Sequence, residues 1–503
     1  MTQTALVDPQ RVLETVYGYS TFRPGQREII DAVLAGRDCI GVMPTGAGKS
    51  LTFQIPAKLL PGTVLVLSPL ISLMKDQVDA LERLGFRAAV LNSTLSEAER
   101  TLRLREVRHG LIELLYVAPE ALRSSLRALL SNCPISLIVV DEAHCISHWG
   151  HDFRPAYRQL RNLKAQFGDI PVLALTATAT RRVAYDIIRE LGMRRPAGYK
   201  GSFYRPNLRL VGHKKGTGRD LRRDILGLVR AHSGESGIIY CGSRRAVDQL
   251  SGWLNSRAVR ALPYHAGMDD RARGEHQDAF ARDRAQVVVA TVAFGMGIDK
   301  SNVRYVVHRD MPRSIEAWYQ EIGRAGRDGL VSDIVTFYSW ADVIAYDAFL
   351  KEIADPSLRV ETQTRTKDLF RLLDRRGCRH QALVRYFDEQ IAPCRTSCDH
   401  CLGIGIDGLL PAAGARRSAI APTWQTENVE LFERLRVLRR ELADADGVPA
   451  YIVFTDSVLR EMARSVPTTM MELRTISGVG PAKAQRYGDD FLRVLRAARS
   501  GGG

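Results

Sequence analysis

The feature that most restricts the fold is a repeated alternation of short β-branched runs with longer helical patterns. Each short run is followed by a polar or Gly-rich turn and then by a helix-like stretch, an order typical of a parallel sheet covered by helices. The pattern extends from Val33 to Leu210 and restarts after Arg219. It predicts an α/β fold with two lobes, at about 1–207 and 208–342. The expected strands are Cys39–Val42, Val64–Leu67, Leu114–Val117, Leu137–Val140, Val172–Leu175, Ser236–Tyr240, Val287–Ala290, Tyr305–Val307 and Ile334–Phe337.

Beyond residue 342 the strand patterns stop, and the remaining sequence predicts only helices and connecting segments. Residues 343–402 are helical in pattern and basic up to a group of cysteines, which suggests a separate module. Residues 403–424 are rich in Gly, Ala and Pro, as linkers are. The block 425–498 has Leu residues at helical spacing, and 499–503 is predicted to be a disordered tail. A chain of 503 residues is also too long for a single core.

The composition favours a polyanionic partner and argues against a membrane protein. The chain has 71 Lys and Arg residues against 56 Asp and Glu residues, which gives a net charge of +15. Neutralising phosphates releases counterions, so this surplus favours nucleic acid, although a biased genome could also enrich Arg. Apolar runs stay far below the ~20 residues of a membrane span. The start Met1–Thr4 lacks the pattern of a secretory signal, so we expect a protein of the bacterial cytoplasm or nucleoid.

A Gly-rich segment follows the first expected strand and opens a helix, which is the context of a phosphate-binding loop. Its glycines allow backbone N–H groups to surround a β-phosphate at the helix N-terminus. Lys49 would bridge the β- and γ-phosphates of ATP, and Ser50 would bind Mg²⁺. The position of the usual first Gly is Met43, and the alternative is a chance Gly-rich turn. The expected nucleotide-binding residues are Thr45, Gly46, Ala47, Gly48, Lys49 and Ser50.

Two acidic residues, Asp141 and Glu142, follow the apolar run Leu137–Val140. Carboxylates at the carboxyl end of a parallel strand point into the crevice where phosphates bind. We therefore expect Asp141 to hold Mg²⁺ through water, and Glu142 to orient and deprotonate the attacking water. Two solvated acids at a strand end are the alternative, which the position after a phosphate loop, with strands between, disfavours.

Two arginines, Arg324 and Arg327, lie in the segment Gln320–Asp328 of the second lobe. Because they are three residues apart, we expect them on one face of one helix. Across a lobe interface they could reach the γ-phosphate as arginine fingers and stabilise the charge of the transition state. A surface salt-bridge pair is the alternative. The finger role is favoured because the second lobe has no phosphate loop of its own and needs a means of coupling to ATP.

With these motifs the chain resembles superfamily 2 helicases, and the wording of the motifs resembles the RecQ family. The similarity runs in order from about Tyr17 to Cys401, and Met43 fits the family as well. It implies two RecA-like lobes, ATP and Mg²⁺ as cofactors, and ATP-dependent 3′-to-5′ unwinding of DNA in repair and recombination. The matching segments are Phe22–Gln26, Met43–Ser50, Ser68–Gln77, Asp141–His144, Leu175–Ala179, Ala290–Asp299 and Gln320–Asp328.

The same resemblance implies further contacts with the nucleotide. Gln26 should read the adenine edge, and Tyr19 and Arg23 should lie around the base. Two other functions remain open at this point. An RNA helicase is one, because contacts to a nucleic-acid backbone do not exclude RNA. The other is a DNA-annealing or strand-clamping protein whose ATPase only switches its affinity for DNA.

A polar loop with aromatic residues follows the carboxylates directly. Trp149, Phe153 and Arg154 could form a stacking platform for unpaired bases, and the segment resembles the RecQ aromatic-rich loop. A buried loop anchor is the alternative. Because the loop is joined to Glu142, binding of DNA could reposition this acid and make the ATPase DNA-dependent. Candidate contacts to the DNA backbone in the first lobe are Ser72, Lys75 and Gln77.

Four of the eight cysteines cluster near the end of the basic helical module. In a long chain without a signal peptide we expect reduced thiols, so the cluster favours metal over disulfides. Thiolates separated by two to four residues suit tetrahedral Zn²⁺, and four of them predict a closed, structural site. The RecQ zinc module looks similar, and free core thiols are the alternative. The expected ligands are Cys378, Cys394, Cys398 and Cys401.

The final block resembles the HRDC domain, a small helical module that follows RecQ motors, in the segments Val448–Tyr451 and Ile476–Lys483. The second segment also resembles a helix-hairpin-helix turn, in which backbone amides hold a DNA phosphate. A tight turn between packed helices is the alternative. The candidate DNA contacts in this block are Tyr451, Gly478, Gly480 and Lys483.

The sequence also indicates what this chain lacks relative to the family it resembles. Most RecQ proteins place a winged-helix domain between the zinc module and the HRDC domain. Only Leu402 to about Gln425 is available here, which is too short for a domain of even ~50 residues. We therefore expect the winged helix to be missing, and single-stranded and forked or tailed duplex DNA to be the partner.

Overall fold

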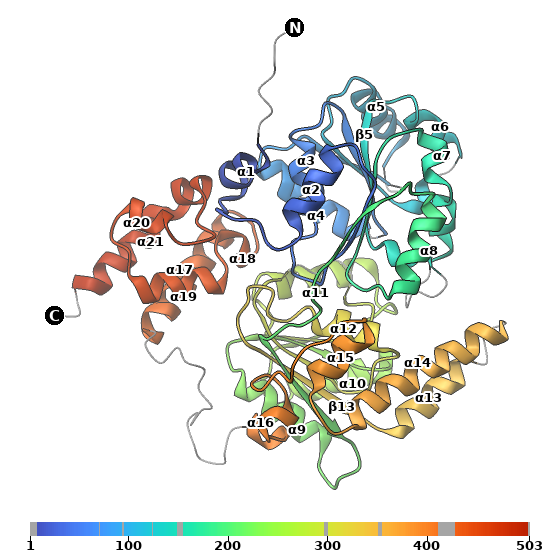
Figure 1. Ribbon diagram of the computed structural model, residues 1–503. Coiled ribbons are helices and arrows are strands. Elements are labelled where there is room, and N and C mark those ends of the chain that lie inside the picture. Colours follow the sequence, from blue (N-terminus) through green and yellow to red (C-terminus); the bar gives the residue numbers. More distant parts are fainter. Residues whose placement is uncertain are drawn as a thin grey trace. The chain divides into compact units, whose positions relative to one another are not determined.

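The computed structural model describes residues 8–69, 71–92, 95–122, 124–147, 154–295, 300–350, 355–410 and 428–500. Internal contacts divide the chain into two compact units, Met1–Phe203 and Tyr204–Gly503 (Figure 1). Most of the expected linker at 403–424, and the last residues of the expected tail, lie outside the described residues. No helix among the described residues is long and apolar enough to cross a membrane.

The first unit contains a seven-stranded parallel sheet in the order β3-β4-β2-β5-β6-β1-β7. All five strands expected from the sequence are present. The sequence pattern does not predict β3 and β7, which are the two edge strands and are rich in Ala and Gly, residues with low strand propensity. The strands are β1 (Cys39–Val42), β2 (Thr63–Leu67), β3 (Ala88–Leu91), β4 (Leu114–Val117), β5 (Ile135–Val140), β6 (Val172–Thr176) and β7 (Ala197–Lys200).

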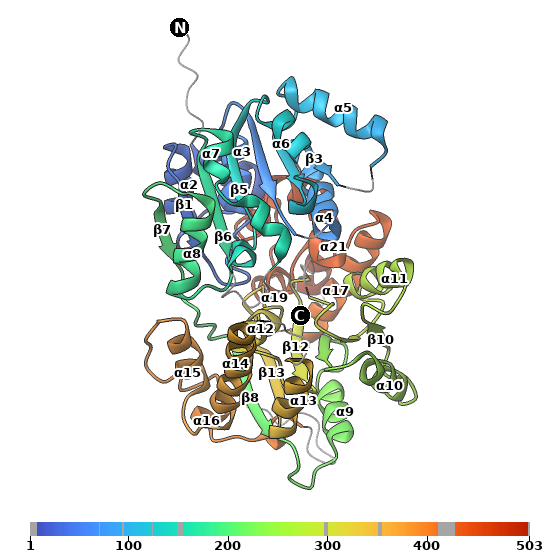
Figure 2. The same cartoon turned by 90° about the vertical axis from the view of Figure 1, so that its right-hand side faces the viewer.

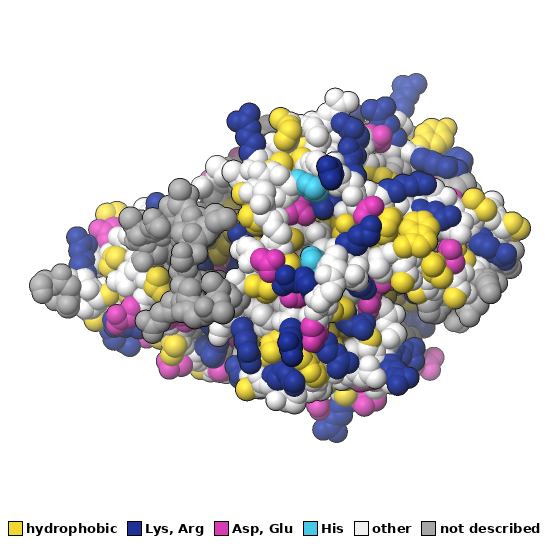
Figure 3. Space-filling view, turned by 90° about the horizontal axis from the view of Figure 1, so that it is seen from below, with side chains coloured by type: hydrophobic (Ala, Val, Ile, Leu, Met, Phe, Trp, Pro, Cys, Tyr) yellow, Lys and Arg dark blue, Asp and Glu magenta, His cyan; other side chains and the backbone are white. Residues whose placement is uncertain are grey.

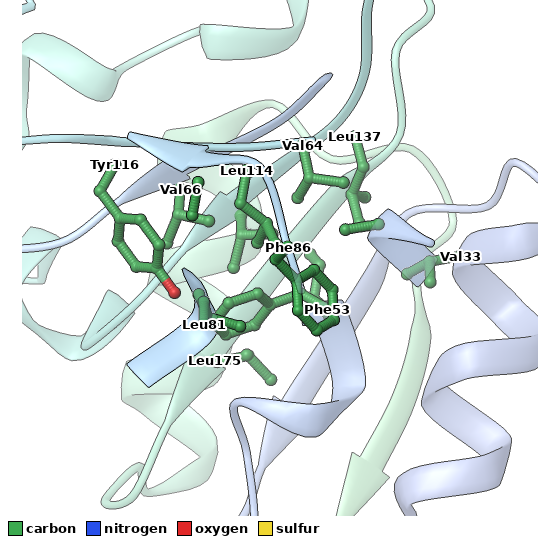
Figure 4. Close-up of a cluster of buried hydrophobic side chains, with 14 of the residues drawn as sticks. Val33, Phe53, Val64, Val66, Leu81, Phe86, Leu114, Tyr116, Leu137 and Leu175 are labelled. Atoms are coloured by element: carbon green, nitrogen blue, oxygen red, sulfur yellow. The ribbon is translucent and has the colours of Figure 1, made fainter. Parts of the chain in front are cut away.

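Helices cover this sheet and pack against alternate residues of its strands. Figure 4 shows Phe53 of α3, Leu81 of α4 and Val33 of α2 in contact with strand side chains that share one face. Residues two apart on a strand point to the same face, as Val64 and Val66 do on β2. The helices are α1 (Pro9–Val12), α2 (Gln26–Leu34), α3 (Leu51–Ala57), α4 (Ile71–Arg83), α5 (Glu97–Arg108), α6 (Ser124–Leu130), α7 (Leu163–Phe167) and α8 (Arg181–Leu191), with short helical turns at Leu13–Tyr17, Pro119–Ala121, Ala143–Ile146 and Pro155–Leu160.

The second unit begins with a six-stranded parallel sheet in the order β10-β11-β9-β12-β13-β8. Its four central strands are those expected from the sequence, and the two that the pattern misses, β8 and β10, are again the edges. The elements of this lobe are β8 (Leu208–Lys214), α9 (Leu221–Ala231), β9 (Ser236–Tyr240), α10 (Arg244–Asn255), β10 (Ala261–Tyr264), α11 (Asp270–Ala281), β11 (Val287–Ala290), β12 (Val303–His308), α12 (Ile315–Ile322) and β13 (Ser332–Tyr338).

A helical region follows β13 and lies along the edge strand β8. Figure 2 shows α14, α15 and α16 beside β8 and β13. The N–H of Leu210 on β8 donates to the Ser397 carbonyl at 3.0 Å, and His380 is hydrogen-bonded to the Leu208 carbonyl at 2.9 Å. The elements are α13 (Trp340–Leu350), α14 (Pro356–Asp374), α15 (Arg379–Tyr386), α16 (Asp399–Leu402) and a helical turn at Ile406–Gly408.

The last part of the chain is all helical among its described residues and has a core of its own. Leu435, Leu459 and Phe491, from three different helices, are completely buried in this core. The Arg439 side chain is also fully buried and forms an ion pair with Asp456 at 2.8 Å. The helices are α17 (Val429–Ala445), α18 (Ala450–Val453), α19 (Asp456–Ser465), α20 (Met470–Arg474) and α21 (Pro481–Ser500).

Candidate nucleotide, metal and nucleic-acid sites

The Gly-rich loop connects β1 to α3 and has the backbone conformation of an anion-binding turn. Gly46 and Gly48 have φ values of 85° and 79°, in the left-handed region that other residues adopt only with strain. The Lys49 Nζ donates to the Met43 carbonyl at 3.3 Å. Ser50 directly precedes α3 and makes no side-chain cap. The first N–H groups of α3 donate to the carbonyls of Gly48, Lys49 and Ser50, so the loop backbone leads directly into the helix and no side-chain anion caps it.

The loop is held from behind by Gln26, the first residue of α2, which is only 1% exposed. Its amide Nε2 donates to the Gly48 carbonyl at 3.0 Å, and its Oε1 accepts from the Arg23 N–H at 2.8 Å. The Arg23 guanidinium in turn donates to the Gly46 carbonyl. A Cβ at Gly48 would lie 2.4 Å from the Gln26 Nε2, so only Gly allows this approach. Gln26 and Arg23 thus join the phosphate loop to the segment that also carries the exposed Tyr19.

The two carboxylates lie at the end of β5, close to the loop. Burial and, to a smaller extent, Glu142 raise the pKa of Asp141 to about 7, against the opposing effect of the Lys49 ammonium. Glu142 has a φ of 47°, an uncommon conformation for a non-Gly residue and a feature of strained functional sites. Its N–H donates to the Asp141 Oδ1 at 2.9 Å. Since a carboxylate whose pKa is raised gains from a neighbouring cation, the donor set fits Mg²⁺.

A chain of polar contacts links Glu142 to the strand β6. The His144 Nδ1 lies 3.3 Å from the Glu142 Oε2 and is hydrogen-bonded to the Thr176 hydroxyl at 2.9 Å. The Thr176 hydroxyl also donates to the Thr178 carbonyl at 3.2 Å. Sequence reasoning did not assign His144, Thr176 or Thr178 a role, although all three lie in the segments that carry the family resemblance.

The two arginines of the second lobe do not share a helix, so that expectation was wrong. α12 ends at Ile322, and the chain leaves it through Gly323 and Gly326, the latter with a φ of 57°. The Gly326 N–H donates to the Val303 carbonyl at 3.0 Å, which turns the chain away from the helix. Arg324 is 8% exposed, and burial lowers the pKa of its guanidinium. Arg327 is half-buried.

The expected DNA-contacting residues of the first lobe are described only in part. Trp149 and Phe153 lie outside the described residues, as does the side chain of Ser72. Lys75 is exposed on α4, and Gln77 is half-buried. The Arg154 guanidinium donates to the Pro69 carbonyl at 3.3 Å, and the Arg154 N–H donates to the Cys145 carbonyl at 3.0 Å. Arg154 therefore connects the end of the aromatic loop to the segment that leads into α4.

The four expected zinc ligands lie together. The Sγ atoms of Cys378, Cys394, Cys398 and Cys401 are all within 4.8 Å of one another. The Cys378 Sγ accepts from the N–H groups of Cys394 at 3.2 Å and Gln381 at 3.4 Å. Burial acts to raise the pKa of Cys378, but these N–H groups outweigh it and the pKa is lowered, whereas burial raises the pKa of Cys394 and of Cys398. Four thiols in this arrangement fit a tetrahedral Zn²⁺ with no open position.

Residues adjacent to the cysteines fasten this site to the second lobe. Arg379 donates to both carboxylate oxygens of Asp399, at 3.0 Å and 3.2 Å, and both side chains are buried. The Asp399 Oδ2 also accepts from the Gly212 N–H of β8 at 3.0 Å. Sequence reasoning did not single out Asp399 or His380. The available signal was their position next to the ligand Cys398 and close to the ligand Cys378.

The turn between α20 and α21 contains the two glycines expected to hold a phosphate. Gly478 has a φ of 94°, and a Cβ there would lie 2.9 Å from a Val458 methyl group, so close packing also requires Gly. Lys483 is half-buried, with its Nζ 5.9 Å from the centre of the Phe454 ring, and burial lowers its pKa to about 8. Tyr451 is half-buried on α18.

Comparison with protein families assigns consecutive parts of the chain to four models. The DEAD/DEAH box helicase model matches residues 23–187, and the helicase conserved C-terminal domain matches residues 220–329. The RecQ zinc-binding model matches residues 340–402, and the HRDC domain matches residues 428–495. The first two models cover the phosphate loop, the carboxylates and the arginines, and the third covers all four cysteines.

Similar proteins of known type extend over nearly the whole chain. An ATP-dependent DNA helicase RecQ of Pasteurella multocida is 38% identical, covering 98% of this chain and 94% of its own length. One from Bacillus subtilis is 35% identical, covering 97% and 98%. The Mycobacterium smegmatis helicase Lhr, solved with single-stranded DNA and AMP-PNP, shares the fold at 17% identity with a TM-score of 0.54, covering 99% of this chain and 74% of that one. The chain therefore belongs to the RecQ family of ATP-dependent DNA helicases.

Proposed function

We propose that this RecQ-type DNA helicase hydrolyses ATP with the residues that surround the loop between β1 and α3. Lys49 bridges the β- and γ-phosphates, Ser50 and Asp141 hold Mg²⁺, and Glu142 orients and deprotonates the attacking water. Thr45, Gly46, Ala47 and Gly48 provide the backbone around the phosphates, and Gln26, Tyr19 and Arg23 bind the adenine side. Arg324 and Arg327 stabilise the transition state when the lobes close on ATP.

The observation that carries this proposal is the electrostatic state of Asp141. Its pKa is raised to about 7 by burial and by Glu142, and Lys49 compensates only in part. The site therefore has a deficit of positive charge at the carboxylates, which a divalent cation would supply. At the same time the start of α3, which has no side-chain cap, favours an anion through the helix dipole. Together these two features match Mg²⁺ and a phosphate better than either does alone.

We propose further that DNA binding is transmitted to Glu142 through the segment that begins after it. The contact between Arg154 and the Pro69 carbonyl supports this proposal, because it joins that segment to the start of α4. Trp149 and Phe153 would stack on bases, and Ser72, Lys75 and Gln77 would contact the backbone of the strand. Contacts to the backbone are independent of sequence, as a translocating motor requires.

The domain composition suggests which DNA substrates the protein handles. Only residues 403–427 separate the zinc-binding match from the HRDC match. The alignment with the Pasteurella protein spans 601 positions although this chain has 503 residues, so that relative carries residues without a counterpart here. Both observations support a motor without a winged helix. We propose 3′-to-5′ unwinding of tailed and forked DNA, with the HRDC block, including Tyr451, Gly478, Gly480 and Lys483, adding affinity.

A strand-displacement assay on tailed duplexes tests this proposal. The full chain should unwind a duplex with a 3′ DNA tail when ATP and Mg²⁺ are present, and should not unwind one with a 5′ tail. Glu142→Gln serves as the control, since it should bind ATP without hydrolysing it. Equal unwinding along an RNA tail would indicate an RNA helicase. Annealing without ATP-dependent unwinding would indicate a strand-clamping protein.

A further inference from the structure

A basic hollow lies on the second lobe between α9 and α10, apart from the nucleotide and zinc sites. It has a volume of about 580 Å³. Its lining includes four arginines and two apolar side chains: Arg222, Arg223, Arg230, Arg257, Leu226 and Trp253. In the view of Figure 3, from below, Lys and Arg side chains predominate over Asp and Glu on the exposed face. None of these residues belongs to the motifs that carry ATP chemistry.

Acidic side chains of the described residues balance only part of the positive charge that lines this hollow. Asp220 is the acidic residue of the lining and pairs with Arg223 at 3.4 Å. Arg222 and Arg230 make no ion pair with any residue that the structure describes. Arg257 only donates to the neighbouring Ser256 hydroxyl, at 2.9 Å. The hollow therefore holds a surplus of guanidinium groups, which an anionic ligand would neutralise.

The indole ring of Trp253 orders two of these guanidinium groups. The Arg257 Cζ lies 4.2 Å from the centre of the ring, and the Arg222 Cζ lies 6.0 Å from it. Stacking of this kind attracts the cation to the ring and limits its motion. A guanidinium that is already ordered loses less entropy when it binds a carboxylate through two parallel hydrogen bonds. Arg222, Arg257 and Trp253 thus form a pre-arranged anion-binding group.

We propose that this hollow binds a short acidic peptide segment of a partner protein. Its carboxylates would bind Arg222, Arg230 and Arg257, and one apolar side chain would lie beside Leu226. The concave shape and the apolar residues beside the arginines match a peptide, because sites for small ligands combine apolar walls with a few polar groups. Charge complementarity would provide the affinity for the peptide. The concave shape and the apolar residues of the hollow would select which acidic peptides bind.

Two other occupants fit the observations less well. A nucleic-acid base would need a free face of Trp253, but Arg257 lies over this ring at stacking distance. The chain's own segment 411–427, which follows Leu410 near Gly227, carries Arg416 and Arg417 and a single acidic residue, Glu427. Its charge does not complement a basic hollow. An acidic segment of another protein remains the best match.

The test measures binding of a defined probe to the full chain. The probe is a fluorescein-labelled peptide rich in Asp with one Phe, followed by fluorescence anisotropy. Arg222→Glu and Arg230→Glu should each weaken binding by about tenfold or more, since each removes a charge-assisted contact and adds a repulsion. Trp253→Ala should weaken it as well. A peptide with Asn in place of every Asp should not bind.

A matched control separates the hollow from net charge. Arg245→Glu changes an exposed arginine at the start of α10, outside the hollow, and should bind the peptide like the unmodified protein. Arg230→Gln provides a milder variant, and unchanged DNA-dependent ATPase shows that each variant is folded. Equal binding of the peptide by Arg230→Glu and Arg245→Glu would overturn the proposal. Full displacement of the peptide by a single-stranded oligonucleotide, lost in the same variants, would also overturn it and assign the hollow to nucleic acid.

Discussion

The two lobes of this helicase share one strand order but differ in helix capping and in charge at the corresponding loops. When the strands of each lobe are numbered from its own first strand, both sheets run third, fourth, second, fifth, sixth, first, and the first lobe adds a seventh strand. By this order β8 corresponds to β1, and β12 corresponds to β5. The loops that follow these strands can therefore be compared directly.

The loop after the first strand contains two glycines with a positive φ in both lobes. Gly46 and Gly48 have φ values of 85° and 79°, and Gly216 and Gly218 have values of 86° and 82°. The difference lies at the helix that follows. In the second lobe the Asp220 carboxylate accepts from the backbone N–H groups at the start of α9, at 2.9 Å and 3.4 Å. This helix N-terminus is thus capped by a carboxylate of the protein, whereas no side chain caps α3.

The charged groups near these loops also differ, because those of the second lobe are paired with one another. Lys215 forms ion pairs with Asp310 at 3.0 Å and Asp342 at 2.9 Å. Burial acts to raise the pKa of Asp310, but Lys215 and Arg309 outweigh it and the pKa is lowered. At the corresponding place after β5, the pKa of Asp141 is raised to about 7. The first lobe thus has a carboxylate, Asp141, whose charge the protein compensates only in part. In the second lobe, Lys215 forms ion pairs with the corresponding acidic groups.

The largest expected effect, on ATP turnover, comes from replacing Lys49 and Lys215 by Ala in two separate variants. Lys49→Ala should abolish ATP turnover, whereas Lys215→Ala should leave turnover largely intact and lower the melting temperature, because Asp310 and Asp342 lose their partner. Glu142→Gln should retain ATP binding and lose hydrolysis, since an amide cannot take up the proton. Phosphate release and binding of a fluorescent ATP analogue measure both properties. A folded Lys215→Ala protein without ATPase would refute the division between the lobes.

The next effect concerns Arg327, one of the two arginines that the second lobe contributes to ATP hydrolysis. Removal of an arginine finger typically costs 10³–10⁵ in rate, so Arg327→Ala should be nearly inactive while still binding ATP. Arg327→Lys keeps the charge without the planar fork and should recover only part of the rate. Single-turnover hydrolysis at saturating DNA measures both variants. If Arg327→Ala kept most of its activity, the assignment of the finger would be wrong.

Loss of the metal should affect the second lobe and spare the first. Metal analysis should find one zinc per chain, and Cys394→Ser should lower the melting temperature before it alters ATP binding. Cys133→Ser, at a buried cysteine of the first lobe outside the cluster, is the matched control. Rapid reaction of all four cluster thiols in the native protein would contradict a zinc site.

Removal of the HRDC block should produce a smaller effect, on DNA affinity. The structure places the cut after Leu410, because Ile406 and Leu409 are buried against the second lobe. The truncated protein should bind forked DNA more weakly and with a shallower dependence on salt, while its ATPase at saturating DNA changes little. Titrations at several salt concentrations measure this. Unchanged fork affinity and unwinding would make the block a protein-interaction module.

The smallest expected effect is on the pH dependence of stability, and it concerns the Asp310 carboxylate of the second lobe. Because the folded pKa of Asp310 lies below its usual value, its carboxylate stabilises the fold above about pH 4. This stabilisation is lost as the pH falls through the lowered pKa. Asp310→Asn should therefore cost about 1 kcal/mol at pH 7 and progressively less in acid. Asp141→Asn in Mg²⁺-free buffer should carry no such cost. Denaturant titrations across pH compare the two, and an equal cost in both lobes would contradict their difference.

The central strands and the sites next to them could be predicted because their signals are local. Strands buried on both faces of a parallel sheet are continuous apolar runs, and each functional motif follows such a run directly. The four strands that the sequence pattern misses, β3, β7, β8 and β10, are all edges. β10 contains Pro263, which only an edge strand or a bulge accepts. Edge strands lack the two-sided burial that makes the others visible.

The features that could not be predicted depend on contacts between distant residues or on a backbone that departs from regular geometry. Spacing alone places Arg324 and Arg327 on one helix, but Gly323 and Gly326 end that helix first. The bond from Gly212 to Asp399 joins residues on different elements, and no local pattern indicates it. The pairing of Lys215 with Asp310 likewise becomes visible only once the strand order is known.

The attachment of the zinc region to β8 has a consequence for the aggregation of protein that has lost its zinc. Along the outer side of β8, the carbonyl of Leu208 and the N–H groups of Leu210 and Gly212 all bind residues beside the cysteines. Without the metal, these groups would form an unpaired strand edge, which other chains can extend by β-pairing. Zinc-depleted protein should therefore be lost by aggregation that rises steeply with protein concentration, at temperatures where the first lobe is still folded. The zinc-binding cysteines would thus keep the edge strand β8 from pairing with other copies of the chain.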